Sequence, residues 1–259
     1  NSSGDRNSGL LGYFIINGHM KACVTSAKMI RNKPFTIPGK NQSKWDYITE
    51  IRCEHNTRWR STSTFKCMIT KNKLIYVNLP FLLKSSVALS IPLVDVFTLL
   101  NIGKDEAFNL IIGNSSDKKL INIAKTNVLN HPHANFTREE VVTLIGNQGS
   151  TERTPAKKAK YVNHIVETEL FPHIEKKYKG IYLSIIIRNL INVSMKKKNI
   201  DSRDDVRFKR LDLVGTMMAL LFRQLYRSNI KLFKASLVKA IDSKLFFENV
   251  ADIFSCKKL

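Results

Sequence analysis

Short apolar, β-favouring stretches separated by polar turn residues occur in the first 80 positions and predict a β-rich start to the chain. Residues 12–26 have the pattern of a hairpin, in which Asn17-Gly18 supplies the favoured two-residue turn. Residues 31–44 are predicted to be a loop, because two prolines and a glycine interrupt them. Further strands are expected at 46–53, 62–70 and 73–79.

After about residue 90 the apolar positions recur three and four apart, which predicts helices. A first helix is expected to begin at Ile91-Pro92, since proline is tolerated in the first turn. Thr137 and Glu140 have the spacing of a capping box and mark another helix start. Residues 148–154 are polar and rich in turn-forming residues, so they are expected to form an exposed loop. Other helices are expected at 104–112, 118–129, 155–171 and 181–197.

The last clear pattern is a one-sided apolar stripe near the carboxyl end. It predicts a helix whose apolar face packs in the core. Together, the β-rich first third and the helical remainder predict an α+β fold. The most hydrophobic run, Ile181 to Met195, contains Arg188 and is too short to span a bilayer, so no membrane partner is expected. The stripe consists of Leu211, Val214, Met218, Leu221 and Leu225.

Charge adds a functional constraint to this pattern. The 259 residues include 42 Lys+Arg against 21 Asp+Glu, which gives a net charge of +21 at pH 7. A field of this sign attracts polyanions, and nucleic acid is the commonest such partner. The basic excess is spread over both halves of the chain. This distribution favours the wall of a nucleic-acid channel over a single basic tail.

Neither the cysteines nor the histidines indicate a metal site. The four cysteines, at 23, 53, 67 and 256, are far apart and form no C-x-x-C pair, so free thiols are expected. His131-Pro132-His133 is interpreted as a polar loop rather than a pair of ligands. The sequence also contains neither a D-x-D-x-D motif nor a glycine-rich phosphate loop.

The segment from Asp201 to Gly215 is unusual because acidic and basic residues alternate in it at high density between two apolar stretches. One interpretation is a solvated connector that caps the following helix. The other is that paired charges fix one another's rotamers and hold an arginine or lysine against a phosphate backbone. The residues alone leave these two readings open.

This segment resembles the D-D-R-D-x-x-G-x-K-R-L-D-L-A-G block of the second-largest subunits of multisubunit DNA-dependent RNA polymerases, of the eukaryotic, archaeal and large-DNA-virus type. Ser202 departs from the block, and Arg207 replaces its glycine, which changes the turn if that position needs a positive φ. The matching positions are Asp201, Arg203, Asp204, Lys209, Arg210, Leu211, Asp212, Leu213 and Gly215.

Other pieces resemble the same subunits, in the same order along the chain. Together they cover the chain from about residue 12 to 235. They are G-Y-F-I-I-N-G at 12–18, E-I-R at 50–52, R-S-T-S at 60–63, I-P-L-V-D-V-F at 91–97, I-G at 145–146, E-L-F-P-H-I at 169–174 and L-F-R at 221–223.

The resemblance implies the lobe domain of that subunit inserted in part of its protrusion domain. On this reading residues 1–44 belong to the protrusion, 45–175 form the lobe, and 176–259 return to the protrusion. The enzyme implied is a nucleotidyltransferase, with its catalytic magnesium and its zinc elsewhere in the complex and no cofactor in this stretch. The implied partners are DNA, the RNA–DNA hybrid, and the largest and other polymerase subunits. The implied location is the nucleus, or the cytoplasm or virion for a large DNA virus.

The implied role is one jaw of the DNA cleft, which guides nucleic acid by non-specific contacts to phosphates. Two rival functions stay open. One is a free-standing basic nucleic-acid-binding protein. The other is a docking module for transcription factors, on a face containing Asp105, Glu106, Glu139 and Glu140. Candidate nucleic-acid contacts are Arg203, Lys209, Arg210, Lys196, Lys197 and Lys198, and the expected structural ion-pair network comprises Asp201, Asp204 and Asp212.

Overall fold

The computed structural model describes residues 13–22, 24–40, 43–55, 62–84 and 87–242. The chain divides into two compact units, 1–28 with 210–259, and 29–209. The described residues contain an antiparallel sheet followed by seven α-helices, so the predicted α+β class is confirmed.

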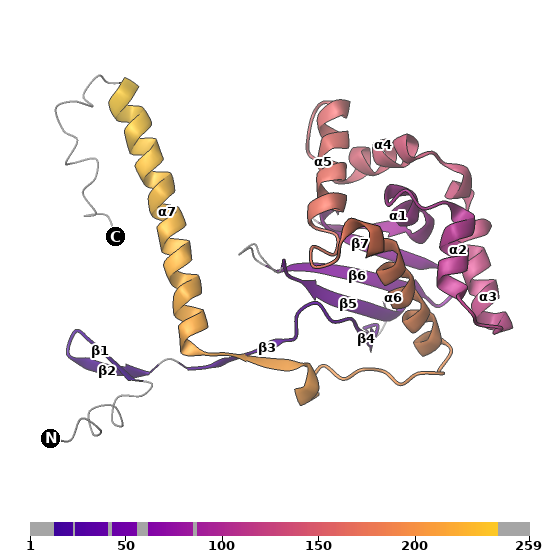
Figure 1. The fold of residues 1–259 in the computed structure, drawn as a ribbon, viewed down its shortest axis with the longest axis horizontal. Coiled ribbons are helices and arrows are strands. Elements are labelled where there is room, and N and C mark those ends of the chain that lie inside the picture. The colour runs from indigo at the N-terminus through magenta and orange to yellow at the C-terminus, as the bar shows by residue number, and fades with distance from the viewer. Residues whose placement is uncertain (1–12, 23, 41–42, 56–61, 85–86, 243–259) are drawn as a thin grey trace. The chain divides into compact units, whose positions relative to one another are not determined.

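The larger unit, 29–209, contains a five-stranded antiparallel sheet in the order β4-β5-β6-β7-β8 (Figure 1). Each strand pairs with the next along the chain, so the connections between them are short. The predicted strands at 46–53, 62–70 and 73–79 are confirmed as β5, β6 and β7. The strands are β4 (Phe35–Pro38), β5 (Trp45–Cys53), β6 (Ser63–Thr70), β7 (Ile75–Lys84) and β8 (Val87–Pro92).

Helices follow the sheet in this unit. They are α1 (Leu93–Leu99), α2 (Lys104–Ile112), α3 (Lys118–Ala124), α4 (Arg138–Gly149), α5 (Pro155–Thr168) and α6 (Lys179–Ser194). Short helical turns lie between them at η1 (Lys125–Leu129), η2 (Pro132–Asn135) and η3 (Lys176–Tyr178), and a further one, η4 (Val206–Phe208), follows α6. None of the helices in the described ranges combines the length and apolar composition that crossing a bilayer requires.

The core lies between the sheet and the helices. In β6, Phe65, Cys67 and Ile69 alternate toward this core and are fully buried. The ring of Phe65 lies 4.6 Å from that of Phe171, and α6 packs across β5 and β6. β4 and α6 therefore belong to the same compact unit as β5 and β6, and the predicted domain bounds at 44 and 175 stay a prediction.

One prediction for this unit was wrong. Residues 31–44 are not only loop, because β4 forms there and pairs with β5 from Phe35 opposite Glu50 to Pro38 opposite Tyr47. Proline fits at Pro38 because β4 is the edge strand. The helix expected after Ile91-Pro92 is confirmed as α1, which begins at Leu93 with Pro92 directly before its first turn.

The smaller unit contains the predicted hairpin, β1 (Tyr13–Ile16) with β2 (His19–Ala22), and a long helix, α7 (Val214–Asp242). Asn17 and Gly18 have φ of 51° and 75°, as a type I′ turn requires. Two further short strands, β3 (Ser26–Met29) and β9 (Lys209–Asp212), pair with each other.

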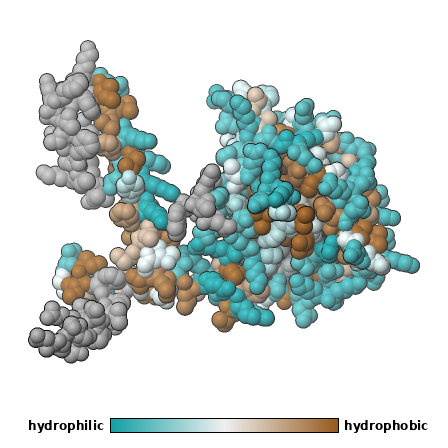
Figure 2. Space-filling model, viewed as in Figure 1, coloured by the Kyte–Doolittle hydropathy of each residue, from teal (hydrophilic) through white to brown (hydrophobic). Residues whose placement is uncertain are grey.

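The prediction that the apolar stripe of α7 packs in the core was wrong for the described part of the chain. Met218, Leu221 and Leu225 are 45–56% exposed, and Figure 2 shows hydrophobic residues on the surface of this helix. Leu211 belongs to β9 rather than to the helix. The period of the stripe predicted the helix correctly, but a period does not identify what covers the apolar face.

Candidate nucleic-acid interface

The charged segment 201–208 is held along the edge of the sheet at both of its ends. The backbone N–H of Asp201 donates to the carbonyl oxygen of Thr36, and the Asp201 carboxylate accepts from the Thr36 N–H, each at 2.9 Å. At the other end, the N–H of Ile30 donates to the carbonyl oxygen of Phe208 at 2.7 Å, and the Phe208 ring lies 6.4 Å from that of Phe35. Asp201 thus satisfies the outward-facing backbone groups that an edge strand leaves unpaired.

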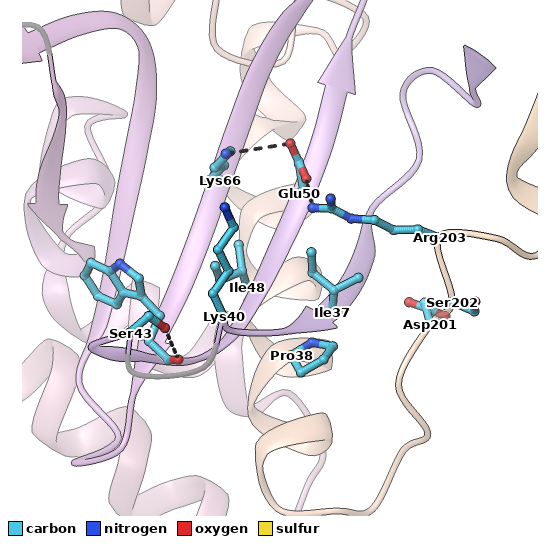
Figure 3. A pocket seen from close by; sticks show the side chains of 11 residues that line it. Ile37, Pro38, Lys40, Ser43, Ile48, Glu50, Lys66, Asp201, Ser202 and Arg203 are labelled. Atoms are coloured by element: carbon cyan, nitrogen blue, oxygen red, sulfur yellow. Dashed lines mark hydrogen bonds and ion pairs between the residues drawn. The ribbon is translucent and has the colours of Figure 1, made fainter. Parts of the chain in front are cut away.

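Arg203 lies beside the exposed face of β5. Its guanidinium is 2.9 Å from Glu50, and the same carboxylate is 3.8 Å from Lys66 on β6 (Figure 3). Glu50 and Lys66 stand opposite one another in the β5–β6 register, so the two charges are cross-strand neighbours. The predicted nucleic-acid contact of Arg203 stays a prediction, and its partner in this structure is Glu50.

Asp204 and Asp205 differ in their surroundings. Asp204 is exposed, and its backbone N–H donates to Ser202 Oγ at 3.2 Å. Asp205 pairs with Arg207 at 2.6 Å, and these hydrogen bonds lower the pKa of the Asp205 carboxyl. Arg207 lies in the short turn η4 without a positive φ, so arginine fits the position where the related block has glycine.

Lys209, Arg210 and Asp212 follow in β9. Asp212 is 9% exposed and forms an ion pair with Lys28 on β3. Lys209 is half-buried and Arg210 exposed, and both take part in interactions within the molecule. The expected ion-pair network of Asp201, Asp204 and Asp212 stays a prediction. In the contacts described above, each of these aspartates has a different partner.

The lysines 196–198 lie just after α6, and all three are exposed. Lys196 has a φ of 58°, which turns the chain at the end of the helix. Lys197 is 2.5 Å from Asp117, a contact that lowers the pKa of the Asp117 carboxyl, and Lys198 donates to Asn189 at 3.5 Å. Positive charge is favourable here because the carboxyl end of a helix carries a partial negative charge.

A cavity of about 500 Å³ lies beside Arg203 and was not predicted from the sequence (Figure 3). Apolar side chains from β4 and β5 form much of its lining, and charged side chains surround them. Alternation in β5 could have indicated which residues share this face, but the sequence does not show that 201–203 return to it. The lining residues are Ile37, Pro38, Lys40, Ser43, Trp45, Ile48, Glu50, Lys66, Asp201, Ser202 and Arg203.

The loop at His131-Pro132-His133 is tied to the core rather than simply solvated. His133 Nδ1 lies 2.9 Å from Asp95, whose side chain is 1% exposed. Burial raises the pKa of the Asp95 carboxyl, although its contact with His133 acts in the opposite direction. Within the described residues, no three or more His, Cys, Asp or Glu side chains are arranged to hold a metal ion.

Comparison with known proteins identifies related chains. DNA-directed RNA polymerase II subunit 2 of Arabidopsis thaliana is 28% identical over 251 residues, which are 90% of this chain and 20% of that protein. DNA-directed RNA polymerase III subunit RPC2 of Saccharomyces cerevisiae is 27% identical over 242 residues, 89% of this chain and 20% of that protein. DNA-directed RNA polymerase subunit 2 of Acanthamoeba polyphaga mimivirus is 23% identical over 263 residues, 90% of this chain and 21% of that protein.

The chain therefore spans about a fifth of the length of these relatives. The family described as RNA polymerase Rpb2, domain 2, matches residues 34–212, which is more than half of the chain and includes the whole five-stranded sheet, helices α1 to α6 and β9. On this match, the chain belongs to the RNA polymerase Rpb2 domain 2 family.

Proposed function

We propose that this chain is part of the second-largest subunit of a DNA-directed RNA polymerase and lines the path of nucleic acid with basic side chains. The observation that carries the proposal is the group of three exposed lysines at 196–198, held at the end of α6 in a chain of net charge +21. Lysines contact phosphates without reading bases, which suits an enzyme that moves along any sequence. Lys209 and Arg210 are the second proposed group.

In this role the chain contributes no catalytic residue, and the magnesium and zinc of the polymerase are held elsewhere in the complex. Its partners are DNA, the RNA–DNA hybrid and the other polymerase subunits. The enzyme acts in the nucleus or, for a large DNA virus, in the cytoplasm or virion.

A photocrosslinking amino acid at position 196 of the assembled polymerase tests this role. In a transcribing complex it is expected to crosslink to nucleic acid, whereas the same group at position 157, on α5, is not. Crosslinks from position 196 to protein alone would overturn the proposed contact. Lys157 is a suitable control because it is also an exposed lysine at a helix end.

Docking of transcription factors is a second proposed role, on a different surface. Lys104 Nζ is 2.7 Å from Asn135, so the start of α2 lies beside the turn that leads into α4. The first turns of these two helices carry the acids of the proposed surface, Asp105 and Glu106 of α2 and Glu139 and Glu140 of α4. Replacing these four acids with their amides should reduce factor binding and leave elongation unchanged. Loss of elongation instead would contradict a docking role.

A further inference from the structure

The cavity between β4, β5 and residues 201–203 is suited to binding the side chains of a partner rather than its backbone. Thr36 of the edge strand is already bonded through both its N–H and its carbonyl oxygen to Asp201. Pro38, the next outward-facing residue of β4, has no N–H to donate. A partner therefore cannot add a strand to this edge and must bind through its side chains.

The apolar lining specifies what part of a partner enters. Ile37 and Ile48 face each other in the β4–β5 register, and with Pro38 they form an aliphatic surface in the cavity (Figure 3). A space of about 500 Å³ is within the range of small-ligand pockets and accommodates one large apolar side chain with its neighbours.

The aromatic residue of the cavity does not offer an open stacking platform for a base. The Trp45 ring contacts Tyr76 edge-on at 5.7 Å, and Lys44 Nζ lies 5.1 Å from its centroid and 4.9 Å from that of Tyr76. Single-stranded nucleic acid binds such sites mainly by stacking bases on exposed rings. A protein side chain fits the cavity better than a base.

The charged residues of the cavity indicate which residues should flank that apolar side chain in the partner. The cavity is lined by the cations Lys40, Lys66 and Arg203 and by the carboxylates Glu50 and Asp201. Glu50 is shared by Arg203 and Lys66, and Asp201 accepts from the Thr36 N–H, so both carboxylates are already engaged. Lys40 is exposed at the rim, in a chain whose overall charge is strongly positive.

We infer that this cavity docks a segment of a partner protein that carries one large apolar side chain flanked by acidic residues. The apolar side chain packs on Ile37 and Ile48, and the flanking carboxylates face Lys40 and Lys66. This role is separate from the proposed phosphate contacts at 196–198, which lie outside the cavity.

The test uses the assembled polymerase and a fluorescein-labelled peptide with a central leucine between aspartates, followed by anisotropy. Ile48→Asp places a carboxylate on the apolar surface and should weaken binding more than tenfold. Val87→Asp is the matched control, because Val87 is 69% exposed on β8, at the opposite edge of the same sheet. Equal binding by these two variants would overturn the inference, as would no binding by the unaltered polymerase.

A second pair of variants keeps the test independent of folding. Lys40 and Lys125 are both exposed lysines, and Lys125 lies on η1, outside the cavity. Lys40→Glu should weaken peptide binding about two- to fivefold, the range expected for one exposed charge contact, whereas Lys125→Glu should not. A peptide with glycine in place of leucine should bind no better than background.

A competition experiment separates protein from nucleic acid as the occupant. If a twelve-residue oligothymidylate displaces the peptide and loses affinity in Ile48→Asp, the cavity binds nucleic acid and the inference is overturned.

Discussion

The hydrogen bond between the Asp201 carboxylate and the Thr36 N–H should stabilise the edge of the sheet against local opening. Thr36 is 4% exposed, and its N–H donates to Asp201 Oδ2 at 2.9 Å. In the variant Asp201→Ala, this buried donor loses its acceptor. Leaving such a donor unsatisfied costs about 1–3 kcal/mol, and more when the acceptor was charged. Locally, this should increase opening of the strand edge.

Hydrogen exchange at the Thr36 amide measures this opening directly. Because each 1.4 kcal/mol is a factor of ten, the cost corresponds to exchange about 5 to 150 times faster. Asp201→Asn should have a smaller effect, because it retains a neutral oxygen acceptor. Asp204→Ala is the matched control, since Asp204 is an exposed aspartate three residues away. If Asp201→Ala and Asp204→Ala give the same exchange rate at Thr36, the bond does not protect the edge.

Further predictions concern the core and its buried titratable groups. Phe65→Ala should lower the free energy of unfolding by about 3–5 kcal/mol in urea, whereas Leu221→Ala on the exposed face of α7 should change it by less than about 0.5 kcal/mol. Cys53 and Cys67 are buried, which raises the pKa of each thiol to about 12, so peptide-resolved mass spectrometry should show both unalkylated at pH 8 until the protein is unfolded. Burial lowers the pKa of Lys179, so the unfolded chain binds more protons than the folded protein from that lowered pKa up to about 10.4. Over that pH range the free energy of unfolding of the unaltered protein, measured in urea, should rise relative to that of Lys179→Met. If the difference between the two proteins stays constant with pH, this prediction is refuted.

Local signals in the sequence predicted several elements closely. The helix expected at 104–112 is α2, and the capping box at Thr137 and Glu140 forms as predicted, with the Thr137 N–H donating to Glu140 at 2.7 Å. The Asn17-Gly18 turn forms as well. In each case the determining interactions lie within a few residues of one another, so sequence spacing is enough to identify them.

Elements that depend on distant partners were not predicted. β4 forms between prolines because β5 supplies its backbone partners and Asp201 satisfies its outer edge. Thr36 and Asp201 are 165 positions apart, so no local pattern contains this pair. The cavity depends on the same distant return of residues 201–203 to the sheet.

The apolar stripe of α7 shows a different limit. A helical period identifies a helix and its apolar face, but the same period results whether that face is covered by the helix's own chain or by another surface. The exposure of Met218 and Leu221 therefore cannot be derived from their spacing in the sequence.

The proposed role of the lysines at the end of α6 is to neutralise phosphates of bound nucleic acid. It is tested most directly by the salt dependence of DNA retention in the assembled polymerase, with Lys196 and Lys198 both changed to Gln. Each lost phosphate contact should reduce the log–log slope by about 0.9 for duplex DNA. The control removes the same two charges from exposed Lys157 and Lys160 of α5. A shallower slope is expected for the first pair alone, and an unchanged slope for that pair would contradict the proposed phosphate contacts.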